Sequence, residues 1–155
     1  MDTSTCPTAL PAPRLNFFAL GPDAMRAMGA LDQRIAQSDL EKPLVELVRI
    51  RVSQINGCAF CIDRHVAEAR RGGEDERRLS TLQVWRDTPF FSERERTALA
   101  WAEALTRISD AHVPDALWER VDQVFAPSQL IDLTLAINAA NSWNRFAIAF
   151  RKLPS

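Results

Sequence analysis

The stretch NGCAFCIDRHVAEAR, residues 56–70, holds two of the three cysteines and one of the two histidines of this 155-residue chain. Scarce Gly and the absence of Pro within it favour a helix over residues 58–71. Each residue of an α-helix advances by about 100°, so positions three and four apart share a face. The side chains that share this face are Cys58, Cys61, His65 and Glu68.

Two kinds of chemistry can use this face. Cysteines three apart in the first helical turn can form a disulfide, and the helix dipole stabilises a thiolate there, which favours Cys58. His65, one turn beyond Cys61, can accept or return a proton. Alternatively, the two cysteines and His65 supply three zinc ligands. A structural zinc site needs four, and the other histidine, His112, lies far along the chain.

A second helix, expected over residues 42–56, ends at the same Asn-Gly turn. Its polar side carries Glu46, Arg49 and Ser53, opposite a side rich in leucine, valine and isoleucine. Taken alone, such a polar side faces solvent. A tight turn at Asn-Gly would instead bring it beside the cysteines.

The rest of the chain also predicts helices. Tyr is absent, Gly is scarce, and no segment alternates apolar and polar residues over the length of a strand. Ser92 and Glu95 form the capping box that opens one of these helices. The sequence therefore predicts an all-α bundle of about six to seven helices. The further helices are expected over residues 23–37, 74–84, 92–108, 114–125 and 128–150.

The last of these segments is apolar on almost every side, as a membrane span would be. Polar residues in its middle would be costly in lipid, so we expect a buried central helix and no membrane insertion. Several of them share one helical face and need hydrogen-bond partners inside the protein or across a subunit contact. These residues are Asn138, Asn141, Ser142 and Arg145.

Residues 1–22 contain four prolines and read as an extended arm, followed by one helical domain over residues 23–155. The arm has no basic cluster and no long apolar run, so a cytoplasmic protein is expected. Cys6 in this arm is taken as an incidental thiol. With 19 basic and 20 acidic residues, the chain has no excess of positive charge for binding nucleic acid.

The segment ELVRIRVSQINGCAFCIDRH, residues 46–65, resembles the core motif of the alkylhydroperoxidase D (AhpD) family, within the carboxymuconolactone decarboxylase superfamily. The match includes the glutamate, both cysteines and the histidine in the family's register. AINAANSWNR, residues 136–145, is similar to the final helix of the family.

This resemblance implies an all-α fold, assembly into dimers, trimers or hexamers, and antioxidant defence by thiol-dependent reduction of alkyl hydroperoxides or hydrogen peroxide. It implies no bound cofactor, but an external dithiol or a lipoyl-type protein as reductant. Carried over by position, Cys61 would be the peroxidatic thiol, Cys58 the resolving thiol, and Glu46 with His65 a proton relay. Phe60 stands where some members carry another histidine, so the tuning of the thiolate is open.

Two alternatives remain at this stage. One is an enzyme of the decarboxylase branch, which does not depend on a C-x-x-C pair. The other is a non-enzymatic helical oligomer in which the cysteines and histidine clip a metal ion. Large aromatic side chains offer contact area for an oligomer in either case. The tryptophans are Trp85, Trp101, Trp118 and Trp143.

Overall fold

The computed structural model describes residues 10–154, which form nine α-helices and one 3₁₀ helix and no strand. The all-α prediction is confirmed, with more helices than the six to seven expected. The elements are α1 (Phe17–Leu20), α2 (Pro22–Ala36), α3 (Lys42–Asn56), α4 (Ala59–Arg71), α5 (Glu76–Thr81), the 3₁₀ helix η1 (Leu82–Asp87), α6 (Glu93–Thr106), α7 (Ile108–Ala111), α8 (Asp115–Val124) and α9 (Pro127–Ala149).

The longer helices begin and end where local signals place them. Pro lies in the first turn of α2, α3 and α9, where its missing N–H costs nothing. The capping box of α6 is confirmed: the Ser92 hydroxyl accepts from the Glu95 N–H at 3.2 Å. In return, the Glu95 carboxylate accepts from the Ser92 N–H at 2.7 Å.

Within residues 1–22, which the sequence predicts to be extended, residues 17–20 form the short helix α1, which begins at Phe17. Its side chain is buried, and its ring lies 5.5 Å from that of Phe146 and 5.8 Å from that of Phe150. The Asn16 side chain caps the turn by accepting from the Ala19 N–H at 3.2 Å. Residues 1–9, with Cys6, lie outside the described residues.

Two expected helices are divided in the structure. The helix expected over residues 74–84 becomes α5 and η1. Thr81, the last residue of α5, has φ −103° and ψ 2°, and within η1 Val84 adopts the non-helical angles φ −118° and ψ 30°. The helix expected to reach residue 108 ends at Thr106. Arg107 has φ −107° and ψ 36°, and the short α7 follows it.

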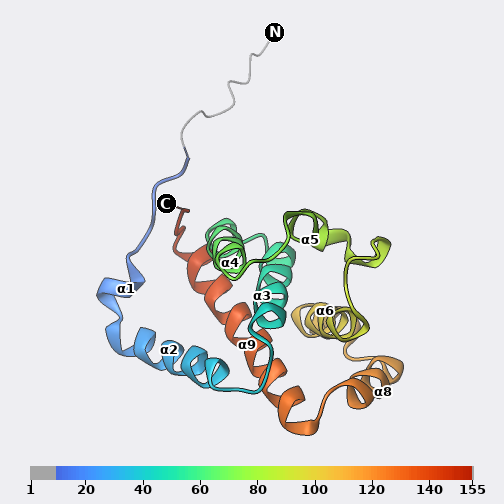
Figure 1. Ribbon diagram of the computed structural model, residues 1–155. Coiled ribbons are helices and arrows are strands. Elements are labelled where there is room, and N and C mark those ends of the chain that lie inside the picture. Colours follow the sequence, from blue (N-terminus) through green and yellow to red (C-terminus); the bar gives the residue numbers. More distant parts are fainter. Residues whose placement is uncertain (1–9, 155) are drawn as a thin grey trace.

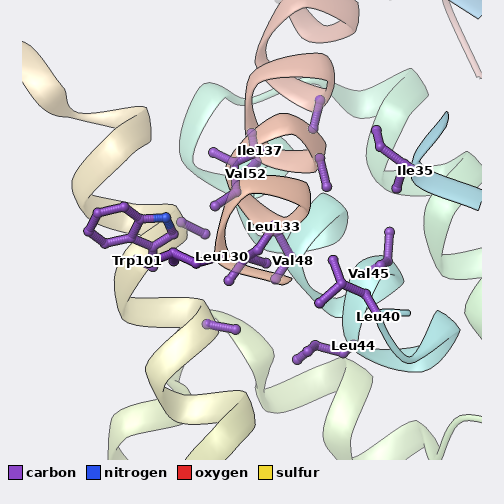
Figure 2. Close-up of a cluster of buried hydrophobic side chains, with 14 of the residues drawn as sticks. Ile35, Leu40, Leu44, Val45, Val48, Val52, Trp101, Leu130, Leu133 and Ile137 are labelled. Carbon is purple, nitrogen blue, oxygen red and sulfur yellow. The ribbon is translucent and has the colours of Figure 1, made fainter. Parts of the chain in front are cut away.

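Helix α9 runs through the middle of the molecule, with α3 beside it, α1 and α2 on one side, and α6 and α8 on the other (Figure 1). Helices α3, α6 and α9 enclose the main apolar cluster (Figure 2), in which Val48, Leu133 and Ile137 are fully buried. The buried central position expected for the last helix is thus confirmed. Among residues 10–154, no helix is both long and apolar enough to cross a membrane.

The sequence predicts that the polar stripe of α9 is buried, and this holds for only part of the stripe. Asn141 is buried, whereas Asn138 and Arg145 are exposed. Asn144, outside the expected stripe, is the most deeply buried of these polar residues, at 1% exposure. The side-chain amide of Asn56 on α3 donates to the side-chain oxygens Oδ1 of Asn141 at 3.0 Å and of Asn144 at 2.9 Å. These polar groups therefore join α3 to α9.

Candidate active site

The turn between α3 and α4 sets the position of the first cysteine. Gly57 ends α3 in the left-handed conformation, with φ 70° and ψ 33°, which glycine adopts without steric cost. The next backbone N–H, that of Cys58, donates to the carbonyl of Ser53 at 3.0 Å. Cys58 therefore caps α4, and its Sγ accepts from the Cys61 N–H at 3.3 Å.

Cys58 and Cys61 are joined by a disulfide, with their Cα atoms 5.3 Å apart. Both side chains are buried, and they pack against Ala147 of α9 and the ring of Phe60. The first turn of α4 therefore brings the two thiols within bonding distance, as the three-residue spacing predicts. This is the oxidised state of the pair.

His65, one turn after Cys61, is bonded to a carboxylate of α3. Its Nδ1 lies 2.9 Å from Oε2 of Glu46, and the other oxygen, Oε1, accepts from Nη1 of Arg49 at 2.9 Å. Burial alone would raise the pKa of Glu46. The hydrogen bond and charge of His65, together with the Arg49 guanidinium, outweigh burial and leave this pKa below its ordinary value of 4.5.

An ionised Glu46 defines the proton positions on His65. A carboxylate can only accept hydrogen bonds. In the 2.9 Å contact between Nδ1 of His65 and Oε2 of Glu46, the proton is therefore carried by Nδ1. In the neutral imidazole the other nitrogen, Nε2, is then free to accept a proton. Glu46 thus fixes the orientation of the His65 ring.

A pocket of about 870 Å³ opens beside these groups. Cys61, His65, Glu46 and Arg49 all line it, whereas Cys58 is not among its lining residues. The polar side of α3 therefore lies beside the cysteine face at Glu46 and Arg49. Ser53 is instead buried against Asn144, whose amide donates to its hydroxyl at 3.0 Å. Aromatic rings complete the wall: Phe17, Phe18, Phe60 and Trp143.

The metal alternative requires several ligand side chains in one place. Within residues 10–154, no three side chains of His, Cys, Asp or Glu gather as metal ligands would. His112 follows α7 at a left-handed φ of 53° and is not among the residues lining the cysteine pocket. Glu68, the fourth residue of the expected face, lines the pocket and pairs with Arg71 at 2.9 Å.

Residues 22–104, which include α2, α3, the cysteine pair and most of α6, match the sequence profile of the carboxymuconolactone decarboxylase family. The chain belongs to this family. One relative is the uncharacterized protein YdfG of Bacillus subtilis (strain 168), 42% identical over 136 residues, which cover 88% of this chain and 92% of YdfG.

Solved structures place this family member among AhpD-like proteins. One is a protein of unknown function from Agrobacterium tumefaciens, Atu0492, a candidate antioxidant defence protein AhpD. It has a TM-score of 0.90 and 38% identity, covering 93% of this chain and 99% of Atu0492. An uncharacterized peroxidase-related protein from Silicibacter sp. TM1040 has a TM-score of 0.79 and 27% identity, covering 89% of this chain and 73% of its own.

Some pocket residues of this family member escaped the sequence analysis. Asp32 of α2 lines the pocket, and so do Phe17 and Phe18 of α1, in the segment expected to be an extended arm. Trp143 also lines the pocket, although the sequence indicates it only as contact area for an oligomer. These residues are far from the cysteines in sequence, so no spacing within one helix could have indicated them.

Proposed function

We propose that this member of the carboxymuconolactone decarboxylase family is a thiol-dependent peroxidase, which reduces alkyl hydroperoxides or hydrogen peroxide. The observation that supports the proposal is that one pocket wall contains both an oxidisable cysteine and a histidine paired with a carboxylate. This wall holds Cys61, bonded to Cys58, together with His65, bonded at 2.9 Å to an ionised Glu46. A general base beside an oxidisable thiol is the arrangement that peroxide reduction requires.

The first step oxidises Cys61. Nε2 of His65 takes the thiol proton, and the thiolate sulfur attacks the terminal oxygen of the hydroperoxide. An S–O bond forms as the O–O bond breaks, which leaves sulfenic acid on Cys61 and an alkoxide. The alkoxide takes the proton back from His65 and leaves as the alcohol, while Glu46 stabilises the imidazolium in between.

The second step returns the site to the bonded state. The Cys58 sulfur attacks the sulfenic sulfur, the S–S bond forms, and hydroxide leaves as water with the proton of Cys58. An external dithiol, or a lipoyl-type protein, then reopens the disulfide by thiol exchange and is itself oxidised. A cytoplasmic location, in which thiols are kept reduced, belongs to this proposal.

The pocket supports Cys61 over Cys58 as the thiol that meets peroxide. Cys58 caps the N-terminus of α4, and the helix dipole at this position favours a thiolate on Cys58. Cys61, however, lines the pocket and lies one turn from His65, whereas Cys58 is not among the lining residues. Access and a neighbouring base are both needed for the first step, so we assign it to Cys61 and assign resolution to Cys58.

Stopped-flow oxidation tests this assignment. Cumene hydroperoxide is mixed with reduced protein and with the Cys58→Ser and Cys61→Ser variants, all carrying Cys6→Ser so that the third thiol consumes no oxidant. The Cys58→Ser variant should accumulate sulfenic acid at Cys61, trapped with dimedone. The Cys61→Ser variant should react no faster than an ordinary thiol. His65→Gln should slow oxidation about 100-fold, the usual contribution of general base catalysis.

Other outcomes would point to the alternatives. Equal, slow oxidation of all variants would rule out a peroxidase. Zinc at one equivalent per chain in protein purified without chelator, lost with either cysteine, would support the metal clip. Decarboxylation of a carboxymuconolactone that survives replacement of both cysteines would support the decarboxylase reading.

A further inference from the structure

Behind the Glu46–His65 pair lies an ion pair that reaches a different helix. The guanidinium of Arg49 is held at both ends: Nη1 donates to Glu46 Oε1, and Nη2 donates to Oδ1 of Asp32 on α2, each at 2.9 Å. The second oxygen of Asp32, Oδ2, accepts from the indole N–H of Trp143 on α9 at 2.8 Å. The line of contacts thus runs from α9 through α2 and α3 to His65 on α4.

The contact between Glu46 and Arg49 joins residues three apart on one helix, and their side chains are 18% and 16% exposed. A contact within one helix does not by itself fix the long Arg49 side chain, which can adopt several rotamers. Asp32 supplies a second anchor from another helix. Its position is defined in turn by Trp143, whose indole is stacked at 6.0 Å on the ring of Phe18. A rigid aromatic ring therefore lies at the far end of the line.

We propose that Asp32, held by Trp143, is a positioning residue that fixes Arg49 against Glu46 and thereby orients the Glu46–His65 pair. With Oε1 occupied by Arg49, the carboxylate presents Oε2 to Nδ1 of His65. Neither Asp32 nor Trp143 acts on substrate in this scheme. The consequence for catalysis rests on the proposed peroxidase function, whereas the structural role does not.

Other charged groups line the same pocket and face this line of contacts. Two carboxylates are already paired: Glu68 with Arg71 at 2.9 Å and Glu74 with Arg78 at 2.7 Å. Lys42 and Arg64 also line the pocket, and none of the ion pairs found among residues 10–154 includes them. Variants that leave all of these groups in place isolate the effect of Asp32.

The Asp32→Asn variant distinguishes positioning from simple competition. If Asp32 positions Arg49, its loss frees the guanidinium from Glu46, and the pKa of Glu46 rises by about one unit. If Asp32 merely competes for Arg49, its loss strengthens the Glu46 contact, and the pKa of Glu46 falls. The measurement is a pH titration of the Glu46 carboxyl carbon by NMR in the disulfide form, with the signal assigned through Glu46→Gln. A fall, or no change, overturns the proposal.

Matched variants complete the test. Asp23→Asn makes the same replacement on α2 at an exposed pair with Arg26, and it should leave the Glu46 titration unchanged. Asp32→Glu keeps the charge and should restore most of the wild-type titration. Trp143→Phe keeps an aromatic ring but removes the N–H donor to Asp32. It should raise the pKa of Glu46, as Asp32→Asn does, but by a smaller amount. Because this variant leaves Asp32 in place, it serves if Asp32→Asn does not fold.

Kinetics provide a second readout. With cumene hydroperoxide as substrate, Asp32→Asn should lower kcat/KM about tenfold, mainly through kcat, because asparagine keeps the size of the Asp32 side chain in the pocket wall. If the wild-type protein shows no peroxidase activity but the Glu46 titration shifts as expected, the proposed function fails and the positioning role stands. If peroxidase activity is present and the titration does not move, the positioning role alone fails.

Discussion

Glu46 and Glu103 are both partly or wholly buried carboxylates, but their partners give them different roles. Glu103 of α6 accepts from Nε of Arg51 and Nε1 of Trp85, each at 2.9 Å, and also from Arg86. Burial would raise the pKa of Glu103, and these donors outweigh it and lower the pKa. Two guanidinium groups and an indole only donate hydrogen bonds, so Glu103 joins α3, η1 and α6 as a structural group. Glu46 instead contacts a histidine, which can exchange a proton.

Glu103→Gln should lower the free energy of unfolding by about 3 kcal/mol at pH 7, because it leaves the buried charge of Arg51 without its partner. The folded pKa of Glu103 is below the ordinary 4.5, so this stabilisation is present above pH 4.5 and is lost as the pH falls through the folded pKa. Urea unfolding at pH 7 and in steps below 4.5 should show the two proteins converging.

The matched control for that measurement is Glu119→Gln, an exposed glutamate on α8. It should change the free energy of unfolding by less than about 0.5 kcal/mol. A Glu103→Gln effect as small as the control, or one that grows as the pH falls, would contradict the ion-pair account.

At the scale of elements, the turn between α3 and α4 decides whether the site forms. It places Glu46 and Arg49 of one helix beside Cys61 and His65 of the next, and Gly57 makes that turn with φ 70°. Both helices could be predicted to within a residue, because Pro43 and the Asn-Gly turn are local signals. The division between α5 and η1 could not, because no glycine or proline marks the boundary at Thr81.

Gly57→Ala should destabilise the protein by about 1 kcal/mol, since an L-residue is strained at this φ. The strain is confined to the backbone, because an added Cβ would meet no atom within 4 Å. Gly29→Ala in α2 is the matched control. A Cβ there also meets nothing within 4 Å, but the site is an ordinary helical position, so about 0.5 to 1 kcal/mol of stabilisation is expected. Thermal unfolding of both variants checks the opposite signs.

At the scale of the whole molecule, oligomer formation stays a prediction. Of the tryptophans expected to supply contact area, Trp85 and Trp101 are buried in the core, and Trp118 is 48% exposed. Apolar side chains also reach the surface at Leu20 and Ile131, each 69% exposed. Such residues cost little singly, but they are available for contact between chains.

Sedimentation velocity at micromolar concentration should therefore find a species heavier than one 17.4 kDa chain. Repeating the run at high salt should leave it intact if the contact is apolar, because salt screens only charged contacts. A single monomeric species at these concentrations would remove the prediction.

Local signals were enough to predict most of the longer helices and the register of Cys58, Cys61 and His65, because helical periodicity acts between near neighbours. The sequence also indicated Glu46, through a resemblance that covers both helices. That Asp32 and Trp143, 111 positions apart, meet behind that glutamate is visible only in the folded protein. Which distant side chains meet depends on how helices pack around a shared core, and local spacing carries no record of that packing.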